Sequence, residues 1–212
     1  MRKAVVLGLV LLAATPVMAA NVLVNGDFST NPNLMAGNSG GAVTLGQWYK
    51  WWAPWDGQDT VYDSANGNPA GSLKSAGGGS QGAYQVVQVP SGVSVTVGGD
   101  WNVSSASWIE VMLFSYASVP TMTEVQGRCD TGNVADIAFK KEGYSSDGWV
   151  DASQFKWPTG NQGTVTSLGY IVVATKLGNG GTAFFDNLTA TPEPVTMLLL
   201  GIPALFLRRR HA

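Results

Sequence analysis

Aromatic side chains gathered in one short stretch are the residues of this chain best suited to hold a ligand. Eight tryptophans occur in 212 residues, and residues 47–56 read Gln-Trp-Tyr-Lys-Trp-Trp-Ala-Pro-Trp-Asp. Sugar rings present C–H faces that stack on Trp and Tyr, while sugar hydroxyls need short polar partners such as Asn, Gln and Asp. Residues 47–59 supply both kinds of group, so this stretch is a candidate platform for a glycan.

Strand alternation divides these aromatic residues between two faces. If a strand begins at Trp48, then Trp48 and Trp52 lie on one face, while Tyr49 and Trp51 lie on the other. One of the two faces must pack into the core, so about half of the aromatic residues are structural. A second interpretation is an aromatic surface that contacts a matrix and has no defined ligand.

Catalytic chemistry has little support in the sequence. The single histidine, His211, lies in the C-terminal tail, which excludes a Ser-His-Asp or Cys-His nucleophile and a His-based zinc site. A glycosidase needs only two carboxylates, about 5 to 9.5 Å apart. The acids that could supply them are Glu110, Glu124, Glu142, Asp136 and Asp151. No spacing singles out a pair, so we expect a protein without enzyme activity and keep a glycoside hydrolase as the weaker alternative.

Charge and cysteine usage limit the partners. Residues 21–191 contain seven Lys plus Arg and thirteen Asp plus Glu, which gives a formal net charge of −6. Nucleic acid and anionic surfaces are therefore not expected partners, because they need clustered cations. Cys129 is the single cysteine, so no intrachain disulfide can form, and a half-buried thiol without a special role is expected.

The elements that must position these residues are short strands separated by clusters of Gly, Asn and Ser. Ser107–Tyr116 is apolar on both faces, as in an inner strand that is covered on both sides. Residues 29–46 are expected to form a surface loop, and residues 178–181 a hairpin turn. Residues 134–141 are either a short helix or an edge strand. Further strands are expected at residues 60–62, 72–74, 84–89, 93–97, 150–157, 165–174 and 183–189. About nine or ten strands, with no helix that the pattern clearly indicates and no repeat, predict one all-β domain, a jelly-roll β-sandwich.

Both ends of this domain resemble a known family. The opening Asn21–Phe28 reads Asn-Val-Leu-Val-Asn-Gly-Asp-Phe, and the closing Ala183–Thr189 reads Ala-Phe-Phe-Asp-Asn-Leu-Thr. These segments resemble the first and last strands of CenC-like carbohydrate-binding modules, which are galactose-binding-like jelly rolls. The resemblance implies a carbohydrate-binding domain over residues 21–191. It also implies that Trp48 and Trp52 pack in the core. The candidates left for an exposed glycan-binding site are Tyr49, Trp51 and Trp55.

The same resemblance implies one structural calcium ion. In these jelly rolls, calcium often ties the first strand to the last through an acid in the closing strand and carbonyls near the first turn. Asp186 holds that closing position and Asp27 lies near the matching first turn, while Ser29 stands where relatives carry Glu. Carboxylates and backbone carbonyls are the ligands that calcium prefers. The alternative for Asp186 is a carboxylate that stabilises a turn without metal.

The N-terminus has the pattern of a secretory signal peptide over residues 1–20. Arg2 and Lys3 precede an apolar run, residues 4–12, and small residues follow at Ala19 and Ala20. Export through the inner membrane is therefore expected, with a mature chain that begins near residue 21.

The C-terminal residues 192–212 resemble the PEP-CTERM sorting signal of Gram-negative bacteria. Pro192, Glu193 and Pro194 come before an apolar run, residues 195–207, and a basic cluster, Arg208, Arg209 and Arg210. Thirteen helical residues span only about 20 Å, and the arginines should stay on the cytoplasmic side. The resemblance implies a short transmembrane helix that exosortase recognises and removes. The expected product is a carbohydrate-binding protein at the cell surface or in extracellular polysaccharide. The alternative is a structural biofilm protein without a glycan ligand.

Overall fold

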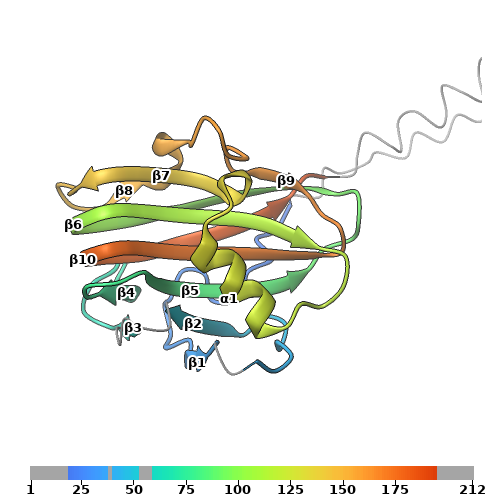
Figure 1. Cartoon of the computed structure of the whole chain (residues 1–212), viewed down its shortest axis with the longest axis horizontal. Helices are drawn as coiled ribbons and strands as arrows, with labels where there is room; N and C mark the ends of the chain where they lie inside the picture. The colour runs from blue at the N-terminus through green and yellow to red at the C-terminus, as the bar shows by residue number, and fades with distance from the viewer. Residues whose placement is uncertain (1–18, 38–39, 53–58, 195–212) are drawn as a thin grey trace, which may run out of the picture. The chain divides into compact units, whose positions relative to one another are not determined.

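Two long strands run side by side through the domain, and each of them contributes to both layers of the fold. They are β6 (Ser94–Tyr116) and β10 (Tyr170–Pro192). The pair is antiparallel from Tyr170, which lies opposite Tyr116, to Pro192, which lies opposite Val95 (Figure 1). The computed structural model describes residues 19–37, 40–52 and 59–194. Residues 20–193 form one compact unit. Trp55, residues 1–18 of the predicted signal peptide, and Arg208, Arg209 and Arg210 lie outside the described residues.

Each half of the long pair belongs to a different layer. In the first layer, the start of β10 pairs with β5, and the end of β6 pairs with β7. We call this the β5 layer. Its other strands extend outward from β5, because β2 pairs with β5 and the two-residue β1 pairs with β2. These strands are β1 (Met35–Ala36), β2 (Trp48–Trp52), β5 (Gln81–Gln88) and β7 (Ile137–Tyr144).

In the second layer, called the β4 layer, the end of β10 pairs with β4, which pairs with β3. The start of β6 pairs with two short strands, β8 and β9. The four added strands are β3 (Asp59–Asp63), β4 (Ser72–Ala76), β8 (Val150–Asp151) and β9 (Thr164–Thr166).

One hydrophobic cluster joins the inner faces of the two layers. The β5 layer contributes Trp48 and Val87, and the β4 layer contributes Leu73 and Phe185. Trp48 is 1% exposed and its ring lies 5.1 Å from that of Phe28. The predicted all-β sandwich is confirmed, and a curled sheet whose two long strands serve both layers is consistent with a jelly roll.

Several expectations about the strands were wrong. Residues 150–157 do not form one strand, because only residues 150–151 are extended and a 3-10 turn follows at residues 152–155. Residues 178–181 do not form a hairpin turn, because β10 continues through them and only shifts its register against β6. Gly180 and Gly181 have φ values of 97° and 107°, so the strand bends here and passes from one layer to the other. Residues 21–28, which resemble a first strand in sequence, form turns and not a strand. They attach to β10 through two backbone hydrogen bonds, Leu188 N–H to Gly26 O and Val22 N–H to Ala190 O.

The fold also contains a helix that was not expected, α1 (Met122–Thr131). Its N-terminus has a capping box in which Thr121 and Glu124 bond each other's backbone N–H groups, and it ends at Gly132 in the left-handed conformation. A short 3-10 turn, η1 (Val134–Asp136), follows and leads into β7. Another, η2 (Ala152–Phe155), follows β8. Residues 134–141 were expected to be either a short helix or an edge strand, and most of them form the strand β7.

Candidate functional site

The predicted aromatic platform is buried on both faces of β2. Trp48 lies in the core as expected, and Trp52 on the same face is half-buried. Tyr49 and Trp51 were expected to be exposed, and this was wrong because each is 0% exposed. Tyr49 and Trp51 do lie on the face of β2 opposite Trp48, as strand alternation predicts, but this second face does not meet water.

Helix α1 covers that second face. Its buried residues Met122, Val125 and Cys129 form a second hydrophobic cluster with Tyr49 and Trp51. Figure 1 shows α1 in front of β5 and β10 in the β5 layer. The binding role predicted for Tyr49 and Trp51 required exposed rings, and both rings are buried.

The C-terminus of α1 is fixed by a buried lysine of β10. Lys176 is 4% exposed, and its Nζ donates hydrogen bonds to Cys129 O at 2.9 Å and Asp130 O at 3.1 Å. A cation at the last carbonyls of a helix is favourable because those carbonyls carry partial negative charge. The helix therefore stays on one half of the outer face of the β5 layer and leaves the other half open.

Strand register brings the side chains of the open half together in rows. Lys176 of β10 lies opposite Glu110 of β6, and Glu110 lies opposite Lys140 of β7. In the next row, Trp108 of β6 lies opposite Gly178 of β10 and Glu142 of β7. These rows place aromatic, acidic and basic groups side by side. Lys176 forms the border with α1, because it bonds the last carbonyls of that helix.

Trp108 lies flat on this surface because Gly178 has no side chain. A Cβ added at Gly178 would stand only 1.9 Å from Cε2 of the Trp108 ring. The indole thus occupies the space directly over the glycine, and it remains half-exposed. A flat, half-exposed indole backed by a strand is a suitable stacking surface for a ring.

Lys140 organises the groups around Trp108. Its Nζ lies 3.3 Å from Glu110 and 3.0 Å from Glu142, and it stands over the rings of Trp108 at 5.9 Å and Trp157 at 4.9 Å. Burial alone would lower the pKa of Lys140, but the hydrogen bond to Glu142 and the nearby Glu110 outweigh it and raise the pKa. Lys140 is therefore charged at neutral pH, and it holds two indoles and two carboxylates in one arrangement.

We call Trp108, Glu110, Lys140, Glu142 and Trp157 the tryptophan–lysine surface. Glu110 is 3% exposed, and its Oε2 has no hydrogen-bond partner in the described part of the chain. Sequence reasoning missed this surface because Ser107–Tyr116 was expected to be covered on both sides. The usable signal was the alternation that places Trp108 and Glu110 on the same face of one strand.

A cavity of about 320 Å³ adjoins the tryptophan–lysine surface at the edge of β7. Lys156 forms a β-bridge to Phe139, and Trp157 N–H donates to Ala138 O at 3.1 Å, so this segment runs along β7. The side chains that matter for the cavity are Lys140, Lys141, Lys156, Glu142, Phe155 and Trp157.

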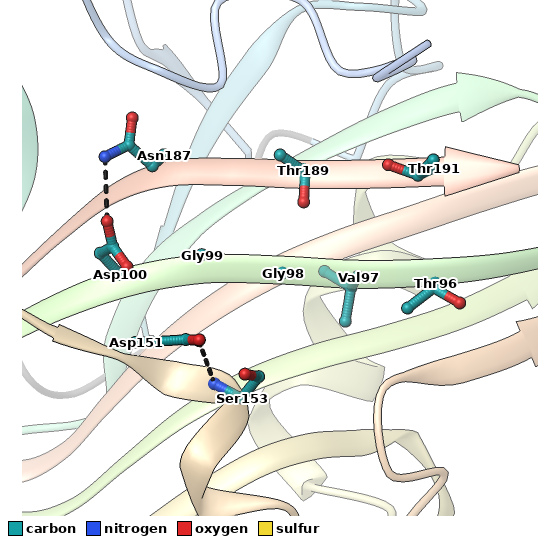
Figure 2. A pocket seen from close by; sticks show the side chains of 10 residues that line it. All are labelled: Thr96, Val97, Gly98, Gly99, Asp100, Asp151, Ser153, Asn187, Thr189 and Thr191. Carbon is teal, nitrogen blue, oxygen red and sulfur yellow. Dashed lines mark hydrogen bonds between the residues drawn. The ribbon is translucent and has the colours of Figure 1, made fainter. Parts of the chain in front are cut away.

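A second groove, of about 420 Å³, lies on the β4 layer and contains no aromatic residue (Figure 2). Gly98 and Gly99 lack side chains, and hydroxyls and acids surround them. Asp100 accepts a hydrogen bond from Asn187 Nδ2 at 2.9 Å. Asp151 accepts one from Ser153 N–H at 2.8 Å. With both acids already bonded and no ring for stacking, this groove is the poorer candidate for a glycan site.

Asp186, the predicted calcium ligand, is 0% exposed. Its carboxylate accepts hydrogen bonds from Asn68 N–H at 2.6 Å and Asn187 N–H at 2.7 Å. Burial raises its pKa, the two hydrogen bonds oppose this, and the charges of Asp100 and Asp27 add to the increase. A cation would relieve this gathering of negative charge.

The fit to calcium is incomplete, however. Asp27 is exposed and bonds Ser29 of its own turn. Among residues 19–37, 40–52 and 59–194, no group of three His, Cys, Asp or Glu side chains could hold a metal ion. Calcium at Asp186 and Asp27 would therefore depend on backbone carbonyls, and it stays a prediction.

The other predicted features fall at the ends of the described chain. Pro192 is the last residue of β10, so the strand enters the segment assigned to sorting. Glu193 N–H donates to Ser94 O at 2.7 Å. Within the described residues, no helix is long and apolar enough to cross a membrane.

Comparison with known proteins concerns the fold. No protein-family model matches the chain, and no curated protein matches it. A protein of Bacteroides thetaiotaomicron VPI-5482, described as sugar binding, has a TM-score of 0.54 and 10% identity, covering 82% of this chain and 100% of its own. A CBM4 structure has a TM-score of 0.49 and 16% identity, over 81% and 99% of the two chains. TmCBM61 in complex with β-1,4-galactotriose has a TM-score of 0.44 and 16% identity, over 82% and 100%. Identities this low bear on the fold alone. Of these three structures, the Bacteroides protein has a TM-score above 0.5, and the chain shares its β-sandwich fold.

Proposed function

We propose that the protein is a non-catalytic module that binds a glycan at the tryptophan–lysine surface. The observation that carries this proposal is the pair of half-buried indoles, Trp108 and Trp157, whose ring centroids lie 5.9 Å and 4.9 Å from Lys140 Nζ. Indole faces stack on the C–H faces of sugars, and the ammonium and carboxylate groups can bond the hydroxyls.

The supporting observations come from the open half of the β5 layer. All residues of the surface except Trp157 lie in β6 or β7, and Trp157 follows a β-bridge to β7. Gly178 and Lys140 keep the rings in place, so little conformational entropy is lost when a ligand binds. The Bacteroides protein that shares the fold is itself described as sugar binding. A hydrolase is less well supported, since Glu110 and Glu142 are both bound to the same lysine.

Affinity electrophoresis tests the proposal. The protein is run in native gels that contain neutral or acidic polysaccharides, and its migration is compared with that in an empty gel. We expect retardation by at least one polysaccharide. Trp108→Ala and Trp157→Ala should each lose at least about 1 kcal/mol of binding free energy, the cost that distinguishes the important contacts of an interface from near-neutral ones.

Trp149→Ala is the matched control, because Trp149 is also half-buried but precedes β8 in the β4 layer. It should bind like the wild type, and all variants should keep a cooperative thermal transition. Equal binding by the Trp108, Trp157 and Trp149 variants would show that the site lies elsewhere. If no polysaccharide retards the wild type, the alternative of a structural matrix protein is favoured.

We also propose the cellular route suggested by the two ends of the chain. The protein is exported, held for a time by its C-terminal segment, processed by exosortase, and delivered to the cell surface or extracellular polysaccharide. What supports this is the order of signals in the sequence, with Arg2 and Lys3 before an apolar run at one end and Arg208–Arg210 after one at the other.

A further inference from the structure

The positive charges of the domain are unevenly distributed. Residues 21–191 contain only seven Lys plus Arg. Three of these seven residues, Lys140, Lys141 and Lys156, line the same cavity of about 320 Å³ beside β7. The net charge of the whole domain therefore does not describe the local charge at this edge of the β5 layer. The domain is acidic as a whole, but this cavity is locally basic.

Among the residues that the structure describes, two of these three lysines have no counter-charge. Lys140 is held between Glu110 and Glu142. Lys141 and Lys156 are exposed, and neither forms an ion pair in the part of the chain that the structure describes. The cavity therefore presents two free ammonium groups against one carboxylate, Glu142, which Lys140 already neutralises.

Aromatic rings stand next to these ammonium groups. Lys141 Nζ lies 5.8 Å from the centroid of Phe155, and Lys140 Nζ lies 4.9 Å from that of Trp157. Both rings line the same cavity, whose volume is at the lower end of the range of small-molecule sites, about 300 to 1,000 Å³. A ligand that matches this site has an apolar ring face and a negative charge on one side.

We propose that this cavity receives an acidic sugar, a ring that carries a carboxylate or a sulfate, within the glycan bound by the tryptophan–lysine surface. The inference rests on the proposed function and specifies the substrate class. The sugar ring packs against Trp157 and Phe155, and its anionic group lies between Lys141 and Lys156. The remaining acidic surface of the domain disfavours polyanions that lack a ring to stack.

Affinity electrophoresis at pH 7 with four polymers tests this proposal. The probes are polygalacturonate, dextran sulfate, a neutral β-galactan and poly-glutamate, which is anionic but contains no sugar ring. We expect one or both acidic polysaccharides to bind more tightly than the galactan, and the polymer that does so identifies the anionic group. Raising NaCl should weaken this binding and leave binding of the galactan nearly unchanged, since salt screens exposed charges.

The variants are Lys141→Gln, Lys156→Gln and the double variant. Each single change should lower affinity for the acidic polysaccharide about threefold, and the double change about tenfold, as for exposed charge pairs. Lys74→Gln is the matched control: Lys74 Nζ also stands 5.8 Å from a Phe ring centroid, that of Phe184, but it lies in the β4 layer. It removes the same charge and should not change binding.

The failures of the two proposals can be distinguished. A wild-type protein that binds the galactan but neither acidic polysaccharide overturns the acidic-sugar inference and leaves the proposed function in place. Undiminished affinity of the double variant, or equal retardation by poly-glutamate, also overturns the inference. Binding to none of the three polysaccharides contradicts both proposals.

Discussion

Trp48 and Trp51 illustrate how one strand can bury large rings on both faces. Trp48 Nε1 donates to Val24 O at 2.9 Å in the core between the layers. Trp51 Nε1 donates to Thr175 O at 3.2 Å beneath α1. Each indole therefore has both its apolar contacts and its single donor satisfied, which is the usual state of a structural tryptophan.

We expect Trp48→Ala and Trp51→Ala each to lower the free energy of unfolding by about 3 to 5 kcal/mol, because each leaves a large cavity in a packed cluster. Urea unfolding followed by circular dichroism measures this. Trp149→Ala serves as the comparison and should cost clearly less, since Trp149 is half-buried. A Trp51 variant as stable as the wild type would mean that α1 does not cover this side chain in solution.

Asp186 allows a test of calcium at the same scale. If calcium binds there, Asp186→Ala should lower the melting temperature more in calcium than in chelator, since a ligand that binds only the folded state stabilises it by mass action. Differential scanning calorimetry with and without EDTA measures the difference. An equal loss in both buffers would identify Asp186 as a carboxylate that only fixes the Asn68 and Asn187 backbone.

Residue-level reasoning from the sequence identified Trp48 as core but misplaced Trp51. The alternation of faces follows from strand geometry alone, so it could be predicted. Whether the second face meets water depends on α1, which lies about seventy residues later in the chain, and no local pattern contains that information.

Helix α1 is the element that separates the buried and open halves of the outer face. Its start could have been recognised, because Thr121 and Glu124 have the spacing of a capping box. Arg128, near its end, pairs with Asp136, whose side chain is 4% exposed, and stacks over Phe114 at 4.5 Å. A short amphipathic helix fixed at both ends can cover one half of a sheet and leave the other half free for a ligand.

The capping box makes helix stability depend on pH. Hydrogen bonds from the Thr121 backbone and side chain lower the pKa of Glu124 from its ordinary value of 4.5. A depressed folded-state pKa means that the stabilising contribution is complete above that ordinary value and is lost as the pH falls through the lowered one.

We therefore expect wild type to melt at a higher temperature than Glu124→Gln above about pH 5, and the difference to vanish near pH 2. Melting curves of both proteins across this range measure the effect. A difference that does not change with pH would show that the carboxylate charge has no part in the cap.

The reactivity of Cys129 is an independent test of whether α1 stays packed on the sheet. It is 0% exposed, more deeply buried than expected from the sequence, and burial raises the pKa of its thiol. The thiol should therefore react with a disulfide reagent only when α1 leaves the sheet. Faster labelling in Glu124→Ala than in the wild type at pH 8 would follow directly from the loss of the cap.

The whole domain depends on the bend where β10 passes from one layer to the other. A Cβ at Gly181 would lie 1.8 Å from Ser105 O, and the residue has a φ of 107°. Gly92 has a similar φ of 86°, but nothing lies within 4 Å of its added Cβ. Comparing an Ala substitution at each of the two glycines therefore distinguishes backbone strain from a steric clash between β6 and β10.

We expect Gly92→Ala to cost about 1 to 2 kcal/mol of unfolding free energy from strain alone. Gly181→Ala should cost distinctly more, because β6 and β10 must also move apart. Urea unfolding of both variants checks this, and equal losses would contradict the role given to the bend.

The proposed C-terminal sorting signal, residues 192–212, can be tested in the chain that carries it. If these residues are a sorting signal, replacing Arg208, Arg209 and Arg210 together with neutral residues should impair sorting, because the variant lacks the positive charge expected to keep the C-terminus inside. Immunoblots of membrane and released fractions measure processing. Unchanged processing and surface display in the triple variant would count against the sorting-signal hypothesis.

At this scale the sequence predicted the class of the fold but not its connectivity. Gly, Asn and Ser clusters between apolar stretches correctly indicated an all-β sandwich. The same glycines suggested a hairpin at residues 178–181, where β10 in fact continues against β6. Local composition does not distinguish a turn from a bend, because the outcome depends on which distant strand supplies the hydrogen bonds.

The most direct test of the central claim is to observe the tryptophan rings themselves during binding. The eight tryptophans each give one indole N–H signal in a nitrogen–proton NMR spectrum, and single Trp→Phe variants assign them. The titrant is the oligosaccharide unit of whichever polysaccharide retards the protein. We expect the Trp108 and Trp157 signals to shift with a common dissociation constant, while those of Trp48 and Trp101, 1% and 0% exposed, stay in place. Shifts confined to other tryptophans, with Trp108 and Trp157 unmoved at saturation, would contradict the claim that the glycan binds at the tryptophan–lysine surface.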